Sequence, residues 1–284
     1  MSIDTVGLVG GGQMGAGIAE LAAKAGCKVI VREINAEAVE AAEKRLSSSF
    51  GKALERGKLE QDAHDAAIGN LNYTTDLAEL ADADLVVEAV VESPQVKHEI
   101  FQALDEICTK PDAIFASNTS SIPIASIAVS TQRPENVVGL HFFNPAPVMK
   151  LVEVIPSILT SDDVVERVRT FAADRLGKDP VLAPDRSGFI VNFLLVPYLV
   201  AAIRMLGDGH ATVEDIDNGM KLGCGHPMGP LTLSDMIGLD TIHHVAVAMF
   251  DEYKEQLYAP PPLLSRMVEG GLLGRKTGKG FYDY

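Results

Sequence analysis

The chain has 284 residues, of which 47% are hydrophobic, and a formal net charge of −15 at pH 7. A chain of this length and composition can bury a large core, as one large domain or two smaller ones. Its acidity argues against nucleic acid or an anionic membrane surface as a partner, because like charges repel.

The cysteines and the apolar stretches argue against further classes of protein. Cys27, Cys108 and Cys224 are odd in number and lack the spacing of metal ligands, so neither a disulfide framework nor a metal site is expected. The longest uncharged apolar stretch, residues 187–203, contains glycine, asparagine and proline and is short for a membrane span. No signal peptide is expected, because a glycine-rich motif begins at Gly10. We expect a cytoplasmic protein with no metal and no membrane partner.

The first half of the chain alternates short β-rich apolar runs with helical patterns, which is typical of a parallel sheet covered by helices. Strands are expected over residues 3–9, 28–31, 85–89, 113–116 and 137–143. Helices are expected over residues 13–25 and from Ala36 to about Glu60. The pattern predicts an α/β domain over residues 1–184.

From about Asp185 the strand patterns disappear. Helices are expected over residues 189–206, 231–253 and 263–269, and Thr212 with Asp215 forms a candidate capping box for another. The sequence therefore predicts an all-helical second domain over residues 185–284.

Gly10, Gly12 and Gly15 form a G-x-G-x-x-G motif between the first expected strand and the first expected helix. In such a turn the first glycine makes the bend, the second admits a pyrophosphate, and the third lets helix and strand pack closely. The helix start offers free N–H groups and a positive dipole end to that anion. The motif predicts a Rossmann-type dinucleotide site, with a purely structural glycine turn as the alternative.

Glu33 ends the second expected strand, 18 residues after Gly15. A carboxylate at this place binds the hydroxyls of the adenosine ribose and repels a 2′-phosphate, which favours NAD. The adjacent Arg32 could receive a 2′-phosphate, so NADP stays the alternative.

The densest group of polar residues runs from Ser117 to Glu153. Residues 117–121 follow an apolar strand, so they are expected at the carboxyl edge of the sheet, where open α/β folds bind ligands. His141 and Glu153 lie nearly symmetrically about the turn at residues 144–147, so antiparallel pairing would bring them face to face. A histidine oriented by a carboxylate suits proton transfer from an alcohol. A structural role for the histidine is the alternative.

Two further polar features could have either a functional or a purely structural role. Asn192 interrupts an apolar helix face, where a buried amide needs hydrogen-bond partners of some kind. Residues 44–58 contain five basic residues and a single acidic one, Glu55. This stretch is a candidate binding site for phosphates, and a solvated helix face is the alternative. The five cations are Lys44, Arg45, Lys52, Arg56 and Lys58.

The chain contains six long motifs in a fixed order: GGGQMG at 10–15, SNTSS at 117–121, HFFNPAPVMKLVE at 141–153, GFIVN at 188–192, HPMGP at 226–230 and GRKTGKGFY at 274–282. With these motifs the whole chain resembles the 3-hydroxyacyl-CoA dehydrogenases, especially the short bacterial 3-hydroxybutyryl-CoA dehydrogenases.

The resemblance implies reversible hydride transfer between a nicotinamide cofactor and C3 of a short (S)-3-hydroxyacyl-CoA, with 3-hydroxybutyryl-CoA and acetoacetyl-CoA as the expected pair. It implies that His141 is the catalytic base, that Glu153 orients it, and that Ser120 and Asn192 hydrogen-bond the reacting oxygen. The implied cofactor contacts are Gly10, Gly12, Gln13, Met14, Gly15, Glu33, Glu92, Lys97, Ser120, Asn144 and Lys276. The implied CoA contacts are Ser49, Lys52, Arg56 and Ser120, with Arg56 standing where lysine is more usual.

Two other functions stay open on the sequence. One is a dehydrogenase of the same architecture that acts on a free hydroxy acid, such as a gulonate-type enzyme, and the other is an NAD-binding protein without turnover. A homodimer formed through the helical domain is also expected, because residues 189–203 and 231–250 are very apolar for a domain of about 100 residues to bury alone.

Overall fold

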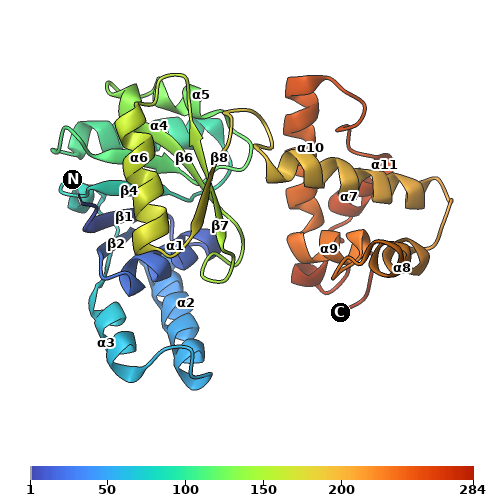
Figure 1. Cartoon of the computed structure of the whole chain (residues 1–284), viewed down its shortest axis with the longest axis horizontal. Coiled ribbons are helices and arrows are strands. Elements are labelled where there is room, and N and C mark those ends of the chain that lie inside the picture. The colour runs from blue at the N-terminus through green and yellow to red at the C-terminus, as the bar shows by residue number, and fades with distance from the viewer. Residues whose placement is uncertain (1) are drawn as a thin grey trace. The chain divides into compact units, whose positions relative to one another are not determined.

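The fold is described from a computed structural model, which places residues 2–284. The chain divides into two compact units, one ending at Asp185 and the other running over Arg186–Tyr284 (Figure 1). The boundary expected after residue 184 lies beside this division.

The first unit is built on a single sheet, to which the residues described contribute eight strands. The strands are β1 (Thr5–Val9), β2 (Lys28–Arg32), β3 (Leu71–Thr74), β4 (Leu85–Glu88), β5 (Ile114–Ser117), β6 (Val137–Phe142), β7 (Leu151–Pro156) and β8 (Asp179–Leu182). Their order is β3-β2-β1-β4-β5-β6-β7-β8. The strands β1 to β6 are parallel, β7 is antiparallel to β6, and β8 is parallel to β7. The predicted mostly parallel sheet is confirmed.

The order of the strands reverses between β1 and β4, and this is the switch point where open α/β sheets bind ligands. The helices of this unit are α1 (Gln13–Lys24), α2 (Ala36–Glu55), α3 (Gln61–Gly69), α4 (Pro94–Ile107), α5 (Ile124–Ala128) and α6 (Asp162–Thr170). In Figure 1, α2 and α3 extend away from the sheet. The helix expected to reach residue 60 ends at Glu55, because the chain turns at Gly57 with φ of +62°.

The two faces of the sheet carry different chemistry. Alternate residues such as Leu8, Val87 and Leu140 form one large apolar core with side chains of α1, α2 and α6. The residues between them point to the other face, where Phe101 of α4 stacks edge-on against Phe115 of β5.

The polar side chains of the central strands share this second face. Glu88 pairs in register with Ser117, Ser117 with Gly139, and His141 with Glu153. Residues in register lie on one face of a sheet, so β4 to β7 present Glu88, Ser117, His141 and Glu153 on the face that carries α4.

The second unit is all-helical, as predicted. Its helices are α7 (Val191–Gly207), α8 (Val213–Cys224), α9 (Pro230–Ile237), α10 (Leu239–Tyr253) and α11 (Pro262–Glu269). Thr212 caps α8 as the N-cap residue of the predicted capping box, because its hydroxyl accepts the Asp215 N–H and donates to the Asp215 carboxylate. Among the helices of residues 2–284, none combines the length and apolar character that crossing a membrane requires.

The single helix expected over residues 231–253 is wrong. Gly238 has φ of +104° and separates α9 from α10. The apolar pattern hides this break because Leu231 of α9 and Leu239 of α10 enter the same core. The local signal for the break is the glycine itself, which reaches a backbone region that other residues rarely adopt.

Candidate active site

The glycine turn after β1 has the geometry that a dinucleotide requires. Gly10 has φ of +96°, and a Cβ on Gly15 would lie 1.8 Å from the Gly10 carbonyl oxygen. A Cβ on Gly12 would meet no atom within 4 Å, so the chain leaves open space beside this residue. Gly12 caps α1 without a side-chain hydrogen bond, which leaves N–H groups of the first turn to a ligand. The turn therefore fits a pyrophosphate.

Glu33 lies beside this turn. Its Oε1 atom accepts the Gly11 N–H at 2.6 Å, which holds the carboxylate at the end of β2 as a ribose contact requires. The Arg45 guanidinium donates to the Gly11 carbonyl at 2.8 Å from α2. Arg45, predicted as part of the cation cluster of α2, thus supports the glycine turn, and sequence reasoning missed this contact.

The pairing of β6 with β7 brings His141 and Glu153 together as predicted. The His141 Nδ1 atom lies 2.8 Å from Glu153 Oε2, and both side chains are buried. The other ring nitrogen, Nε2, lies 3.1 Å from the Ser120 hydroxyl. A carboxylate only accepts hydrogen bonds, so Nδ1 carries the hydrogen and Nε2 is left as an acceptor. The three side chains form a chain from acid to base to hydroxyl.

The serine-rich loop after β5 is held on two sides. Asn118 accepts the Phe142 N–H through its Oδ1 atom at 2.9 Å, which ties the loop to β6. Glu92 accepts the backbone N–H groups of Ser120 and Ser121 at 3.0 and 3.2 Å and also the Thr119 hydroxyl. The position of Ser120 is therefore fixed by the strand on one side and by Glu92 on the other.

Burial alone would raise the pKa of Glu92, but the Lys97 ammonium and the hydrogen bonds from Thr119 and Ser120 outweigh it and hold the pKa below its usual value. A carboxylate with a lowered pKa in the folded state stabilises the fold at pH values above its unfolded pKa. That contribution is lost only as the pH falls through the folded pKa. Glu92 is therefore a carboxylate at neutral pH and can accept all of these hydrogen bonds.

Lys97, a predicted cofactor contact, is 1% exposed. Its ammonium lies 2.6 and 2.8 Å from the two Glu88 oxygens and 3.2 Å from Glu92 Oε2. An ammonium has three hydrogens, and these three contacts use them all. A direct contact between Lys97 and the cofactor stays a prediction, and the geometry supports an action through Glu92.

The turn between β6 and β7 carries Asn144, another predicted cofactor contact. Gln13, at the start of α1, donates to Asn144 Oδ1 at 3.0 Å, which brings these two predicted cofactor residues together. The buried Lys178 ammonium donates to the Ala146 and Met149 carbonyls at 2.6 and 2.7 Å. Burial, with Lys150 nearby, lowers the pKa of Lys178. The lysine clamps the turn between the two strands.

The predicted CoA contacts lie on and beside α2. Lys52 and Arg56 are exposed, whereas Ser49 is half-buried and lines a cavity of about 230 Å³ together with Gln13 and Asn144. The Ser49 hydroxyl donates to buried Glu20 at 2.6 Å, so its oxygen is left to accept from a ligand N–H rather than to donate to a phosphate.

The remaining predicted residues are placed separately. Met14 is partly buried and packs on the core of the first unit. Asn192 and Lys276 belong to the second unit: Asn192 lies half-buried in the first turn of α7, and the Lys276 ammonium binds Asp240 at 2.5 Å. Their predicted contacts with substrate and cofactor stay predictions.

Sequence reasoning missed Glu88, which is completely buried at the end of β4. Its Oε2 atom accepts the Ser117 hydroxyl at 2.7 Å, and its Oε1 atom accepts the Val90 N–H at 2.7 Å. The available signal was a single acid inside an otherwise apolar strand, which is a costly place for a charge unless it is paired.

Comparisons with known proteins agree with this architecture. Residues 5–186 match the family model described as 3-hydroxyacyl-CoA dehydrogenase, NAD binding domain, and residues 188–284 match its C-terminal domain. A 3-hydroxybutyryl-CoA dehydrogenase of Mycobacterium tuberculosis is 53% identical over 283 residues, which is 100% of this chain and 99% of the relative.

Solved structures give the same result. The structure of FadB2 from M. tuberculosis superposes with a TM-score of 0.99 at 52% identity and covers 100% of both chains. That of the (S)-3-hydroxybutyryl-CoA dehydrogenase PaaH1 from Ralstonia eutropha has a TM-score of 0.94 at 42% identity, covering 100% of this chain and 99% of the other.

An NAD-binding Rossmann unit with a histidine–glutamate pair near the carboxyl end of β6 defines a nicotinamide-dependent oxidoreductase. The chain belongs to the 3-hydroxyacyl-CoA dehydrogenase family. The predicted family and the predicted cofactor, NAD, are confirmed.

Two alanine substitutions in the glycine turn separate cofactor binding from stability. Gly12→Ala places a methyl group in open space, so we expect an unchanged melting temperature and an NADH Kd raised at least tenfold, about 1.4 kcal/mol. Gly15→Ala forces a methyl group onto the Gly10 carbonyl, so we expect a clear loss of thermal stability. Thermal melts and NADH fluorescence titrations measure both. Wild-type NADH affinity in Gly12→Ala would contradict the proposed place of the pyrophosphate.

Proposed function

We propose that this protein transfers a hydride reversibly between C3 of a short (S)-3-hydroxyacyl-CoA and NAD, with 3-hydroxybutyryl-CoA and acetoacetyl-CoA as its substrate pair. The observation that carries the proposal is the chain of Glu153, His141 and Ser120, in which Nε2 of the histidine faces a hydroxyl at 3.1 Å. The relatives at 53% and 42% identity are named 3-hydroxybutyryl-CoA dehydrogenases, which supports the choice of substrate.

In this proposal each of four site residues has its own task. His141 accepts the proton of the 3-hydroxyl on Nε2, and Glu153 keeps the ring in the required tautomer and stabilises the imidazolium. Ser120 donates to the oxygen on which charge develops, and Asn192 of the second unit is proposed as its second donor. NAD, when bound, supplies the acceptor for the hydride.

We propose that the exposed cations of α2 hold the nucleotide end of CoA. Lys52 is in the last turn of α2, Arg56 caps that helix, and both belong to the cation-rich stretch of an otherwise acidic chain. Ser49, whose hydrogen is already donated to Glu20, suits an N–H group of CoA and not a phosphate oxygen.

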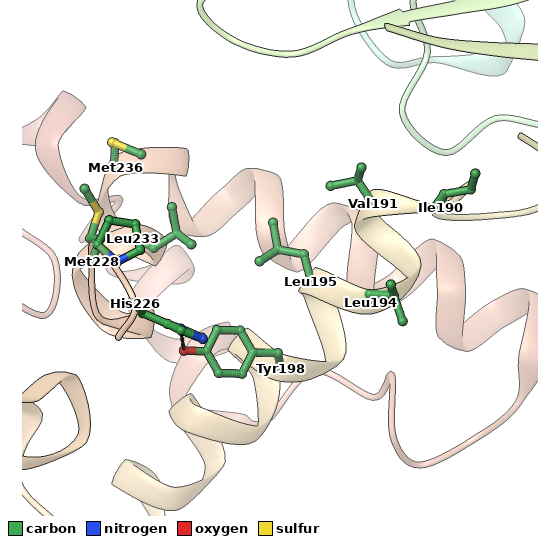
Figure 2. Close-up of a pocket in the computed structure, with 10 residues that line it drawn as sticks. Ile190, Val191, Leu194, Leu195, Tyr198, His226, Met228, Leu233 and Met236 are labelled. Atoms are coloured by element: carbon green, nitrogen blue, oxygen red, sulfur yellow. Dashed lines mark hydrogen bonds between the residues drawn. The ribbon is translucent and has the colours of Figure 1, made fainter. Parts of the chain in front are cut away.

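We further propose that the protein is a homodimer formed through the second unit. A cavity of about 580 Å³ there is lined mainly by apolar side chains of α7 and α9, and Tyr198 and His226, which share a hydrogen bond, line it too (Figure 2). Leu194 on this surface is 70% exposed. Apolar surface of this kind favours contact with another protein surface.

The cytoplasmic location stays a prediction, which subcellular fractionation would test.

The proposed chemistry is tested first by NADH oxidation with acetoacetyl-CoA. We expect turnover by the wild type, and we expect His141→Ala and Glu153→Gln each to lower kcat at least a hundredfold, because the base or its charge partner is lost. NADH affinity should stay within twofold, since neither side chain lies in the glycine turn. An isolated wild-type protein that fails to oxidise NADH with any 3-oxoacyl-CoA would contradict the function, and near-normal kcat in either variant would contradict the mechanism.

The CoA site is tested with two substrates that share the reacting carbons. Arg56→Ala should raise the KM for acetoacetyl-CoA about fivefold, as an exposed ionic contact of ~1 kcal/mol predicts, and should leave acetoacetyl-pantetheine kinetics unchanged. The effect should shrink as salt is added, because salt screens exposed charges. Arg169→Ala on α6 is the matched control and should change neither substrate. Equal losses on both thioesters would show that Arg56 supports the fold instead.

The dimer is tested by sedimentation at micromolar concentration. We expect twice the chain mass of 30.3 kDa, and we expect Leu194→Glu to give monomers, because a charge cannot be buried unpaired in an apolar interface. Ile158→Glu changes a residue of the first unit that is 93% exposed, and this control should stay dimeric. A monomeric wild type would refute the dimer.

A further inference from the structure

A fully buried carboxylate, Glu88, lies behind the proposed active site and takes no part in the chemistry described so far. It is 0% exposed at the end of β4 and shares the sheet face of Ser117 and His141. Burying a charge in this way costs several kcal/mol unless the charge is paired and hydrogen-bonded. Its place in the fold therefore needs an explanation.

Glu88 is compensated by the Val90 N–H and by two side chains, Lys97 and Ser117, that lead toward the serine-rich loop. The Lys97 ammonium lies 2.6 and 2.8 Å from its two oxygens, and the Ser117 hydroxyl donates to Oε2 at 2.7 Å. Lys97 also binds Glu92 at 3.2 Å. A single ammonium thus lies between two carboxylates, and the stronger contacts are those to Glu88.

The consequence appears at Ser120. Glu92 accepts the Ser120 N–H at 3.0 Å, and Ser117, which donates to Glu88, accepts the Thr119 N–H at 3.3 Å. Both routes from Glu88 end in the segment that sets the distance between the Ser120 hydroxyl and His141. If the charge of Glu88 were removed, Lys97 would keep Glu92 as its charged partner and would draw it from the loop.

We propose that Glu88 is a positioning residue of the reaction, which fixes the Ser120 hydroxyl against His141 through Lys97, Glu92 and Ser117. The role in turnover rests on the proposed function, whereas the ordering of the loop does not. Glu88 touches no reacting atom. It anchors the ammonium that keeps Glu92 in place, and the low polarity around these groups strengthens each contact. The lowered pKa of Glu92 agrees with a carboxylate that this arrangement keeps charged.

The first measurement follows loop order without any catalysis. In Glu88→Gln, amide hydrogen exchange in residues 117–122 of the NADH-bound protein should be at least tenfold faster than in wild type. The control is Asp84→Asn, which breaks a similar carboxylate–lysine pair, with Lys110 at 2.6 Å, just before the other end of β4. It should destabilise the protein and leave exchange in this segment unchanged.

The second measurement asks whether the effect passes through Ser120. In the wild-type background, Glu88→Gln should lower kcat for acetoacetyl-CoA reduction at least tenfold and change KM less than twofold. In the Ser120→Ala background, the same substitution should lower kcat less than twofold. Such non-additivity is expected when one residue acts through another. An equal loss of kcat in both backgrounds would overturn the proposal, and so would unchanged exchange.

A variant that does not fold, or a wild type without activity, still leaves a decisive measurement. If Glu88→Gln does not fold, the double variant Glu88→Gln/Lys97→Met leaves no unpaired buried ammonium, and it should show the same fast exchange because Glu92 loses its anchor. If the wild type does not reduce acetoacetyl-CoA, the proposed function fails, while exchange in residues 117–122 still decides whether Glu88 orders the loop. Unchanged exchange in the double variant would overturn the proposal.

Discussion

The pleat of the sheet is the constraint on which the site depends. A strand sends alternate side chains to opposite faces, so a shift of one residue in β6 would replace His141 on the polar face with a residue of the apolar core. The register of β6 and β7 therefore decides whether the histidine meets its glutamate. The turn between these strands is held by Lys178, which binds two of its carbonyls.

Two buried carboxylates on this face are paired in different ways. Glu88 faces an ammonium, which can only donate hydrogen bonds, and this suits the supporting role proposed for Glu88. Glu153 faces an imidazole, whose second ring nitrogen can accept a proton, and this suits the proton transfer proposed for His141. The same type of residue is thus proposed to support the site in one place and to take part in the chemistry in the other, according to the partner it meets.

Much of this arrangement could be predicted because it is local in the sequence. The glycine turn follows its strand directly, and His141 and Glu153 flank one short turn, so symmetry about the turn predicted their contact. The contacts made by Glu88 and Arg45 could not be predicted in this way, because their partners lie on other elements and are reached only through the order of the strands. The break at Gly238 was missed for a related reason: the apolar pattern records which side faces the core and not whether the helix is continuous.

The hairpin of β6 and β7 also bears on how the active site assembles and varies. His141 and Glu153 are 12 residues apart in the chain, whereas Ser117 and its partner Glu88 are 29 apart. Closing a short loop costs less chain entropy, so the acid and base can meet by a local step, while alignment of the serine loop must await the neighbouring parallel strands. The pair proposed to handle the proton is for this reason a self-contained segment of sequence. Insertions in surface loops elsewhere can be accommodated without separating it, but a single residue added within β6 or β7 would move His141 or Glu153 to the other face of the sheet.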